Sequence, residues 1–337
     1  MLAISDQVKE LAEVDPQALP DVILKATQPV VLKGLVARWP AVRAGLESGH
    51  AASAYLRRFY RDATVGAFLG MPEIGGRFFY NDDLSGFNFR PVKIKLDTVL
   101  DEIARHEHAE KPPAIYVGST TVDTCLPGFR AENDLNLGDR QPLASIWIGN
   151  RTRIAAHHDL PDNIACVVAG HRRFTLFPPG EIGNLYVGPL DFTPAGQAIS
   201  LVDFANPDFV RFPRFAEALK NAQVAELDPG DAIFIPSMWW HHIEALDSFN
   251  VLVNYWWRQS PPWMDSPMNA LMLAIMSVRD LPPEQRKAWQ DQFDHYVFAA
   301  DDDTAGHIPP QARRVLSPLD AEAARELRAR LLQKLNR

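Results

Sequence analysis

The sequence predicts a mainly β protein, a double-sheet jelly roll with α-helices before and after it in the chain. Between residues 145 and 257, short apolar runs rich in Val, Ile, Phe and Trp alternate with Gly and Pro turns. Helical periodicity occurs in stretches on both sides of this region. Several short strands with closely spaced turns are typical of a sandwich or barrel, in which inward side chains from different strands can surround one point.

The first 140 residues are predicted to form helices and strands that pack on the core. Residues 1–28 and 41–61 have helical character. Residues 95–109 are predicted to form an amphipathic helix, because apolar residues recur at helical spacing, namely Leu96, Val99, Leu100 and Ile103. Short apolar runs bounded by turn residues predict strands at 29–34, 63–68, 77–80 and 114–118.

The jelly-roll core is predicted over residues 141–260. Turn signals at Gly170, after Phe177 and at Pro229-Gly230 separate predicted strands at 145–149, 163–169, 173–177, 232–235 and 250–257. Between Phe177 and Asp228 lie roughly 50 residues rich in Phe and Pro, which is longer than ordinary connections between elements. We expect part of this insertion, Gly188 to Phe215, to cover the substrate.

Residues 261–337 are predicted to be helical, with helices near 266–280, 283–297 and 319–335. Pro318-Leu319-Asp320 supplies a start signal for the last of them. The three regions together are expected to form one integrated catalytic domain.

Composition limits the class of protein. Hydrophobic residues make up 47% and charged residues 23% of the 337 residues, as in an ordinary globular protein. The net charge of −8 argues against general nucleic-acid binding, and no apolar run approaches the ~18 residues of a membrane span. Cys125 and Cys166 cannot form a disulfide framework, and the first residues lack the pattern of a signal peptide. We therefore expect a cytoplasmic protein without membrane contacts.

Two histidine-rich motifs, His157-His158-Asp159 and Trp239-Trp240-His241-His242, predict a metal site. In an extended chain, residues i and i+2 point the same way, so His157 and Asp159 can bind one ion while His158 points away. One distant histidine would complete a triad of two histidines and one carboxylate, which leaves positions open for substrate and dioxygen. Alternation admits only one of His241 and His242 to the same face, and the residues alone leave that choice open.

Asn254 is a second unusual residue, because it lies inside the apolar stretch 251–255. A buried amide is costly unless it is hydrogen-bonded, so its presence there indicates a polar partner or a ligand.

At these residues the chain resembles the JmjC and cupin-like oxygenases that depend on Fe(II) and 2-oxoglutarate, and among them the asparaginyl hydroxylase that acts on hypoxia-inducible factor. The resembling stretches occur in family order from Pro29 to about Arg258. They comprise residues 29–34 with 39–41, 78–82, 115–117, 156–159, 176–179, 230–236, 239–243 and 253–256. The resemblance implies a double-stranded β-helix (jelly roll, cupin), the cofactors Fe(II), 2-oxoglutarate and O2, and a homodimer formed through the C-terminal helices.

The resemblance also implies roles for individual residues. His157, Asp159 and His241 would be the catalytic metal ligands, because the family pattern places the ligand directly after the second Trp; His242 is the alternative. The cosubstrate would be bound by five further residues, namely Arg172, Tyr116, Asn163, Asn254 and Trp256. Tyr80 would lie on the substrate side.

The chain departs from this family pattern at two places. Arg172 stands where the hypoxia-factor hydroxylase has a lysine; it can bind a carboxylate through two N–H groups but needs more room. Ile154 stands where the relative has a threonine that donates to 2-oxoglutarate. Either Tyr116 and Arg172 suffice for the distal carboxylate, or Thr152 replaces that threonine.

The implied reaction is hydroxylation of a protein side chain, peptide, nucleoside or small metabolite, with release of succinate and CO2. Demethylation is less favoured, because nothing outside the oxygenase core suggests a histone-reading module. The alternative is a metal-binding cupin without oxygenase activity, such as an isomerase or a ligand sensor.

Overall fold

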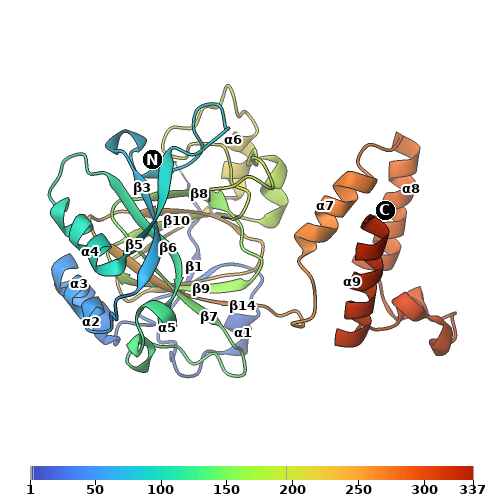
Figure 1. Cartoon of the computed structure of the whole chain (residues 1–337), viewed down its shortest axis with the longest axis horizontal. Helices are drawn as coiled ribbons and strands as arrows, with labels where there is room; N and C mark the ends of the chain where they lie inside the picture. Colours follow the sequence, from blue (N-terminus) through green and yellow to red (C-terminus); the bar gives the residue numbers. More distant parts are fainter. Residues whose placement is uncertain (1, 3, 195, 337) are drawn as a thin grey trace. The chain divides into compact units, whose positions relative to one another are not determined.

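The computed structural model describes residues 2, 4–194 and 196–336, and the chain divides into two compact units, Met1–Gln259 and Ser260–Arg337 (Figure 1). Two β-sheets form the centre of the first unit. The larger contains, in spatial order, β1 (Lys9–Leu11), β2 (Val30–Leu32), β12 (Ala232–Ile235), β9 (Asp162–Ala169), β14 (Asn250–Trp257), β7 (Leu143–Gly149), β6 (Ala114–Thr121), β3 (Thr64–Gly70) and β5 (Phe89–Lys95). The smaller contains β11 (Gln223–Leu227), β10 (Arg172–Phe177), β13 (Trp240–Ala245), β8 (Arg153–His157) and β4 (Arg77–Phe78). The jelly-roll prediction is confirmed.

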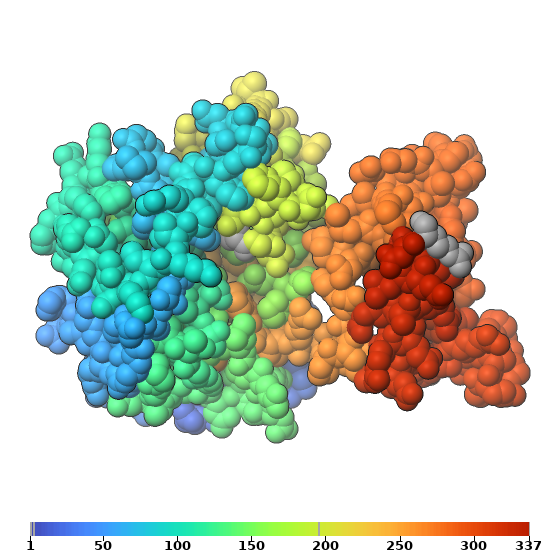
Figure 2. Space-filling model, viewed as in Figure 1, coloured from blue at the N-terminus to red at the C-terminus, as the bar shows by residue number. Residues whose placement is uncertain are grey.

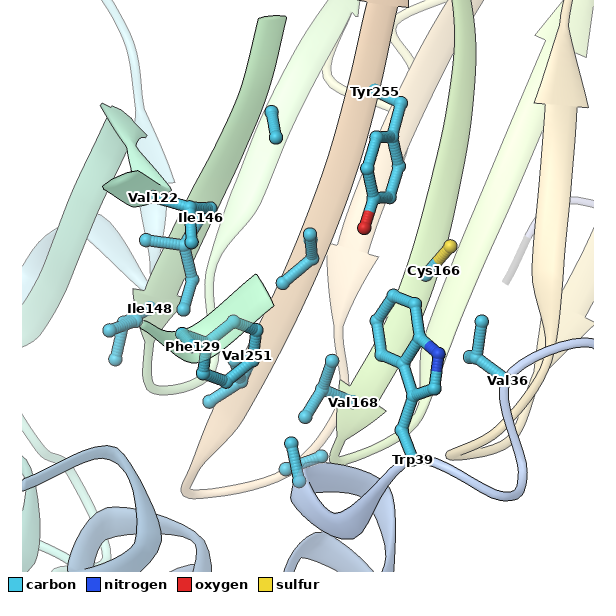
Figure 3. Packing of buried hydrophobic residues seen from close by; sticks show 14 of the residues in the cluster. Val36, Trp39, Val122, Phe129, Ile146, Ile148, Cys166, Val168, Val251 and Tyr255 are labelled. Carbon is cyan, nitrogen blue, oxygen red and sulfur yellow. The ribbon is translucent and has the colours of Figure 1, made fainter. Parts of the chain in front are cut away.

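Helices cover the outer face of the larger sheet, and the main hydrophobic core lies between these helices and the sheet. These helices are α2 (Pro40–Glu47), α3 (Gly49–Arg57), α4 (Leu96–Arg105) and α5 (Val122–Cys125). In α4 the four apolar residues that predicted the helix are each 1% exposed, so they form its buried face. Figure 3 shows Trp39, Cys166 and Tyr255 in this core beside the sheet. Both cysteines are free and buried.

The N-terminal helix prediction for residues 1–28 is wrong over most of its length. The stretch contains strand β1, which pairs in parallel with β2 at the edge of the larger sheet, and only a short helix, α1 (Asp21–Leu24). Pro16 and Pro20 limit helix length, and the open edge of β2 offers backbone partners that a local pattern does not reveal.

Besides β1, four strands have no predicted range: β5, β8, β11 and β13. Strand β5 is an edge strand that carries Pro91 and three basic residues. Proline and charged side chains protect sheet edges from further pairing, and they also hide the strand signal. The predicted helical stretch 41–61 is two helices, because Ser48 is extended and its Oγ accepts from the N–H of Ala51 at 3.0 Å as the N-cap of α3.

The described residues of the insertion between β10 and β11 pack on the smaller sheet. Its short helix α6 (Phe215–Ala218) contributes Phe215 to a cluster with Phe177 and Phe204. Asp203 accepts from Arg153 at 3.0 Å and lies 3.6 Å from Arg77, so the insertion is tied to β8 and β4. Figure 2 shows the yellow-green insertion at the surface beside the cyan segment around residues 75–90.

The second unit contains α7 (Pro267–Ser277), α8 (Pro283–Phe293) and α9 (Ala321–Leu335), so the prediction of three helices near these positions is confirmed. Of the residues described in this unit, only Ala305 is buried. Throughout the described part of the chain, no helix has both the length and the apolar character needed to cross a bilayer.

Candidate metal centre and active site

Strands β8 and β13 bring the two predicted histidine ligands together. The strands are adjacent and antiparallel, and His157 pairs directly with His241 in the register. The two rings lie 4.4 Å apart between centroids. Asp159 follows two residues after the end of β8, and one ligand atom from each of the three residues lies within 4.8 Å of the others. The predicted triad therefore forms one cluster.

Hydrogen bonds orient each member of this triad. Nδ1 of His157 lies 2.9 Å from the carbonyl of Ala155, and Nδ1 of His241 lies 2.9 Å from the carbonyl of Trp239. A carbonyl oxygen only accepts, so each Nδ1 carries the proton and each Nε2 keeps a free lone pair. The indole N–H of Trp256 donates to Oδ2 of Asp159 at 3.2 Å.

The triad has the chemistry of a divalent metal site. Burial and the neighbouring His157 lower the pKa of His241 to about 4, so at neutral pH the ring is in the form that binds a metal. Two imidazole nitrogens and one carboxylate leave several coordination positions open, an arrangement suited to non-haem Fe(II). Catalytic zinc sites usually leave only one. The residues present thus fit an Fe(II) ion.

The second histidine of each doublet points elsewhere. His158 packs against Trp240 with ring centroids 4.6 Å apart, and His242 packs against Phe204 at 4.6 Å. Both are buried, and burial lowers the pKa of both, that of His242 to about 3. The structure therefore brings His241, and not His242, to the cluster with His157.

A cavity of about 350 Å³ lies between the two sheets and contains the triad in its wall. All five residues predicted to bind the cosubstrate line it, namely Asn163, Asn254, Trp256 and Tyr116 from the larger sheet and Arg172 from the smaller. Phe174 and Leu252 are among its apolar walls. The structure thus collects these residues and the triad around one space.

Arg172 is a buried cation without an acidic partner among the described residues. Its side chain faces the cavity, its residue is 3% exposed, and its Nε has no hydrogen-bond partner. Burial lowers its pKa to about 10, so the guanidinium still carries its charge at neutral pH. An uncompensated buried charge costs several kcal/mol, on the order of the penalty for a broken ion pair. Arg172 therefore indicates that an anion binds in this cavity.

The comparison with known proteins agrees with this geometry. A family model described as "Cupin-like domain" matches residues 16–262. The chain belongs to the JmjC and cupin-like oxygenase family. It is similar to "Lysine-specific demethylase JMJ31" of Arabidopsis thaliana, at 36% identity over 38% of this chain and 24% of the relative. It is also similar to "Lysine-specific demethylase 8" of Xenopus tropicalis, at 28% identity over 70% of this chain and 49% of the relative. A third relative is "tRNA wybutosine-synthesizing protein 5" of Gallus gallus, at 35% identity over 31% of this chain and 30% of the relative. The chain spans less than half the length of each of these relatives.

In this member of the cupin-like family, Tyr116 and Arg172 both line the cavity. The two groups interact electrostatically, and burial raises the pKa of Tyr116, so its hydroxyl remains a hydrogen-bond donor. That hydroxyl makes no hydrogen bond to another described residue. Ile154 lines the cavity, whereas the buried Thr152 does not. Thr152, the second of the two alternatives, therefore does not reach the cavity wall.

Ser119 was not selected from the sequence, although it also lines the cavity of this cupin-like protein and carries a hydroxyl. Its Oγ donates to Oγ of Ser145 at 3.1 Å. Strict alternation along β6 would place Ser119 on the face opposite Tyr116. A register shift between Val117 and Thr120 interrupts that alternation, and such irregularities re-aim side chains.

Tyr80 does not line the cavity. It is buried under the insertion, where its hydroxyl donates to the carbonyl of Phe192 at 2.5 Å. The insertion itself contributes Pro194, Gln197 and Ile199 to the cavity wall. Tyr80 therefore contacts the segment of the insertion that reaches the cavity.

Proposed function

We propose that this protein is an Fe(II)- and 2-oxoglutarate-dependent dioxygenase that hydroxylates a protein side chain, peptide, nucleoside or small metabolite. One observation carries the proposal: a triad suited to Fe(II) and an unpaired buried guanidinium face the same cavity. 2-Oxoglutarate has a keto acid at one end, which can chelate a metal, and a carboxylate at the other, which needs a cation. The cavity offers a partner to both ends.

Each residue then has a defined task. His157, Asp159 and His241 would hold the ion, and Trp256 fixes the carboxylate of Asp159 through its indole N–H. Arg172 binds the distal carboxylate of 2-oxoglutarate, and the hydroxyl of Tyr116 donates a hydrogen bond to the same carboxylate. Bound Fe(II) supplies the activation of O2, with conversion of 2-oxoglutarate to succinate and CO2. The apolar walls exclude water from this reaction.

Hydroxylation is a better match to the substrate side than removal of a methyl group from lysine. A methylammonium cation is recognised by carboxylates or by aromatic rings stacked around it. The aromatic rings of the cavity wall all come from the two sheets. The segment of the insertion that reaches the cavity adds neither rings nor carboxylates, since its described lining residues are Pro194, Gln197 and Ile199. Asp159 is the only acidic residue in the cavity wall as far as the chain is described, and the metal would occupy it. We therefore propose a neutral substrate group.

The first test is spectroscopic. Addition of 2-oxoglutarate to the Fe(II)-loaded protein without oxygen is expected to give a weak visible charge-transfer band, because the keto acid chelates the iron. Admission of oxygen should then yield succinate. Iron bound without the band would contradict the proposal and favour the isomerase or sensor alternative. Mass spectrometry of treated cell extracts, searching for products that have gained one oxygen atom, would then identify the substrate.

We also propose that the protein is a homodimer formed through residues 260–337. Large apolar residues are exposed on each of the three helices, for example Met276 (69%) on α7, Trp289 (49%) on α8 and Leu332 (55%) on α9. An exposed apolar surface of this kind marks an association site. A second copy of the same unit presents an equally apolar surface and is the partner that is always available.

The dimer proposal predicts a change of mass in solution. The double variant Met276→Glu/Leu332→Glu is expected to convert a dimer into a monomer in light scattering after size exclusion, because charges would be buried at the interface. Val22→Glu is the matched control, since Val22 is 78% exposed in the first unit. A wild-type protein that is monomeric at micromolar concentration would overturn the proposal.

A further inference from the structure

Trp147 contacts three of the residues predicted to bind the cosubstrate, Tyr116, Trp256 and Asn254. It lies on β7 in the larger sheet and lines the cavity. Its ring stacks on Tyr116 with centroids 5.9 Å apart, and it packs edge-on against Trp256 at 5.7 Å. Its indole N–H donates to Oδ1 of Asn254 at 2.7 Å. One side chain therefore contacts residues placed at both ends of the cosubstrate.

The hydrogen bond to Asn254 fixes the direction of an amide chain. An indole N–H can only donate, so the atom of Asn254 that faces Trp147 must be its oxygen. The amide nitrogen of Asn254 then donates to Oδ1 of Asn163 at 3.2 Å. The amide nitrogen of Asn163 is left without a protein partner among the residues described, and Asn163 lines the cavity.

The sheet register explains why these three residues meet. Asn254 on β14 pairs with Ser145 on β7, two residues from Trp147, and with Ala165 on β9, two residues from Asn163. Each contact is therefore a diagonal between neighbouring strands, within reach of long side chains. The three side chains form a row across the sheet, and the row lies on its cavity face.

We propose that Trp147 is a positioning residue that holds the Asn254 and Asn163 amides with their N–H groups toward the cavity. The site is thereby set to receive a ligand group that only accepts hydrogen bonds, such as a carboxylate or keto oxygen. Without the indole N–H, both amides are free to rotate by half a turn. Asn163 would then direct its oxygen at the ligand oxygen, which repels it. This inference rests on the proposed function and specifies how the same site recognises its cosubstrate.

Trp147→Phe tests the inference, because it keeps an aromatic ring and removes the N–H. The dissociation constant for 2-oxoglutarate, measured by anaerobic calorimetry on the Fe(II)-loaded protein, is expected to rise about tenfold, in line with the loss of one buried hydrogen bond. The affinity for Fe(II) should stay within about twofold of wild type, since the triad is untouched. This split between cosubstrate and metal would not arise from a general loss of structure.

Trp257→Phe is the matched control. Trp257 is on β14, 4% exposed, faces Phe234 on the other side of the sheet, and its indole nitrogen has no partner in the described part of the chain. The Trp257→Phe protein should bind 2-oxoglutarate with the affinity of wild type. A second replacement of Trp147, by benzothienylalanine, keeps the full ring shape with sulfur in place of the N–H, and it should reproduce the weakening seen with Trp147→Phe.

The outcomes separate this inference from the proposed function. Failure of wild type to give the charge-transfer band would end the proposed function itself. If wild type gives the band but the benzothienylalanine protein binds 2-oxoglutarate equally well, the role of the Trp147 N–H is refuted. Equal weakening in Trp147→Phe and Trp257→Phe would also refute it, because the effect would then be one of packing.

Discussion

Replacement of His157 or His241 by alanine is expected to abolish binding of Fe(II), whereas replacement of His158 or His242 by alanine should leave it intact. The first two rings each contribute a ligand atom to the cluster with Asp159, and the other two pack against aromatic rings elsewhere. Loss of a residue that merely supports a metal ligand typically costs 10- to 100-fold in affinity, so loss of a ligand should exceed about 100-fold.

Each histidine doublet thus contains its own matched control, since its two histidines are neighbours in the chain and each is buried or half-buried. Anaerobic calorimetry with Fe(II), and with Co(II) as a redox-stable probe, would give the affinities of the four variants. Thermal unfolding without metal would show whether each variant folds. A protein that loses metal with His242→Ala and keeps it with His241→Ala would contradict the assignment and restore the alternative ligand.

The sequence could identify the triad because two of its members are close in the chain. Alternation over three residues was enough to select His157 and Asp159 and to reject His158. The same rule could not choose between His241 and His242. It shows that the two histidines lie on opposite faces of the strand, but not which of them faces the site. The pairing of His157 with His241 across β8 and β13 decides that question, and this pairing is a property of the folded sheet.

Other parts of the site depend on contacts that no local pattern contains. Gln197 reaches the cavity because Asp203 and Phe192 are held by partners far away in the sequence, Arg153 and Tyr80. The polar partner of Asn254 was predictable, since a buried amide within an apolar strand requires a hydrogen-bond partner. Trp147 was not distinguished from ordinary core aromatic residues, because its role depends on which strands lie beside β7.

Arg172→Leu is expected to weaken 2-oxoglutarate binding at least about 30-fold without changing the affinity for Fe(II). Removing one member of a buried, hydrogen-bonded charge pair costs about 2–5 kcal/mol, and here the other member would be the distal carboxylate. Calorimetry on the Fe(II)-loaded protein measures both affinities. Arg173→Leu is the control, because Arg173 belongs to the same strand but pairs with Glu226 at 3.1 Å, and it does not line the cavity.

Arg172→Leu should also stabilise the folded protein when no cosubstrate is bound. Arg172 is a charge buried without an acidic partner in the described residues, so leucine removes an unfavourable desolvation and should raise the unfolding temperature of the unliganded protein. Wild type should gain stability on adding 2-oxoglutarate, because a ligand that binds only the folded state stabilises it, and Arg172→Leu should gain far less. A variant that is less stable without ligand, yet is stabilised by 2-oxoglutarate as strongly as wild type, would show that Arg172 supports the fold rather than the cosubstrate.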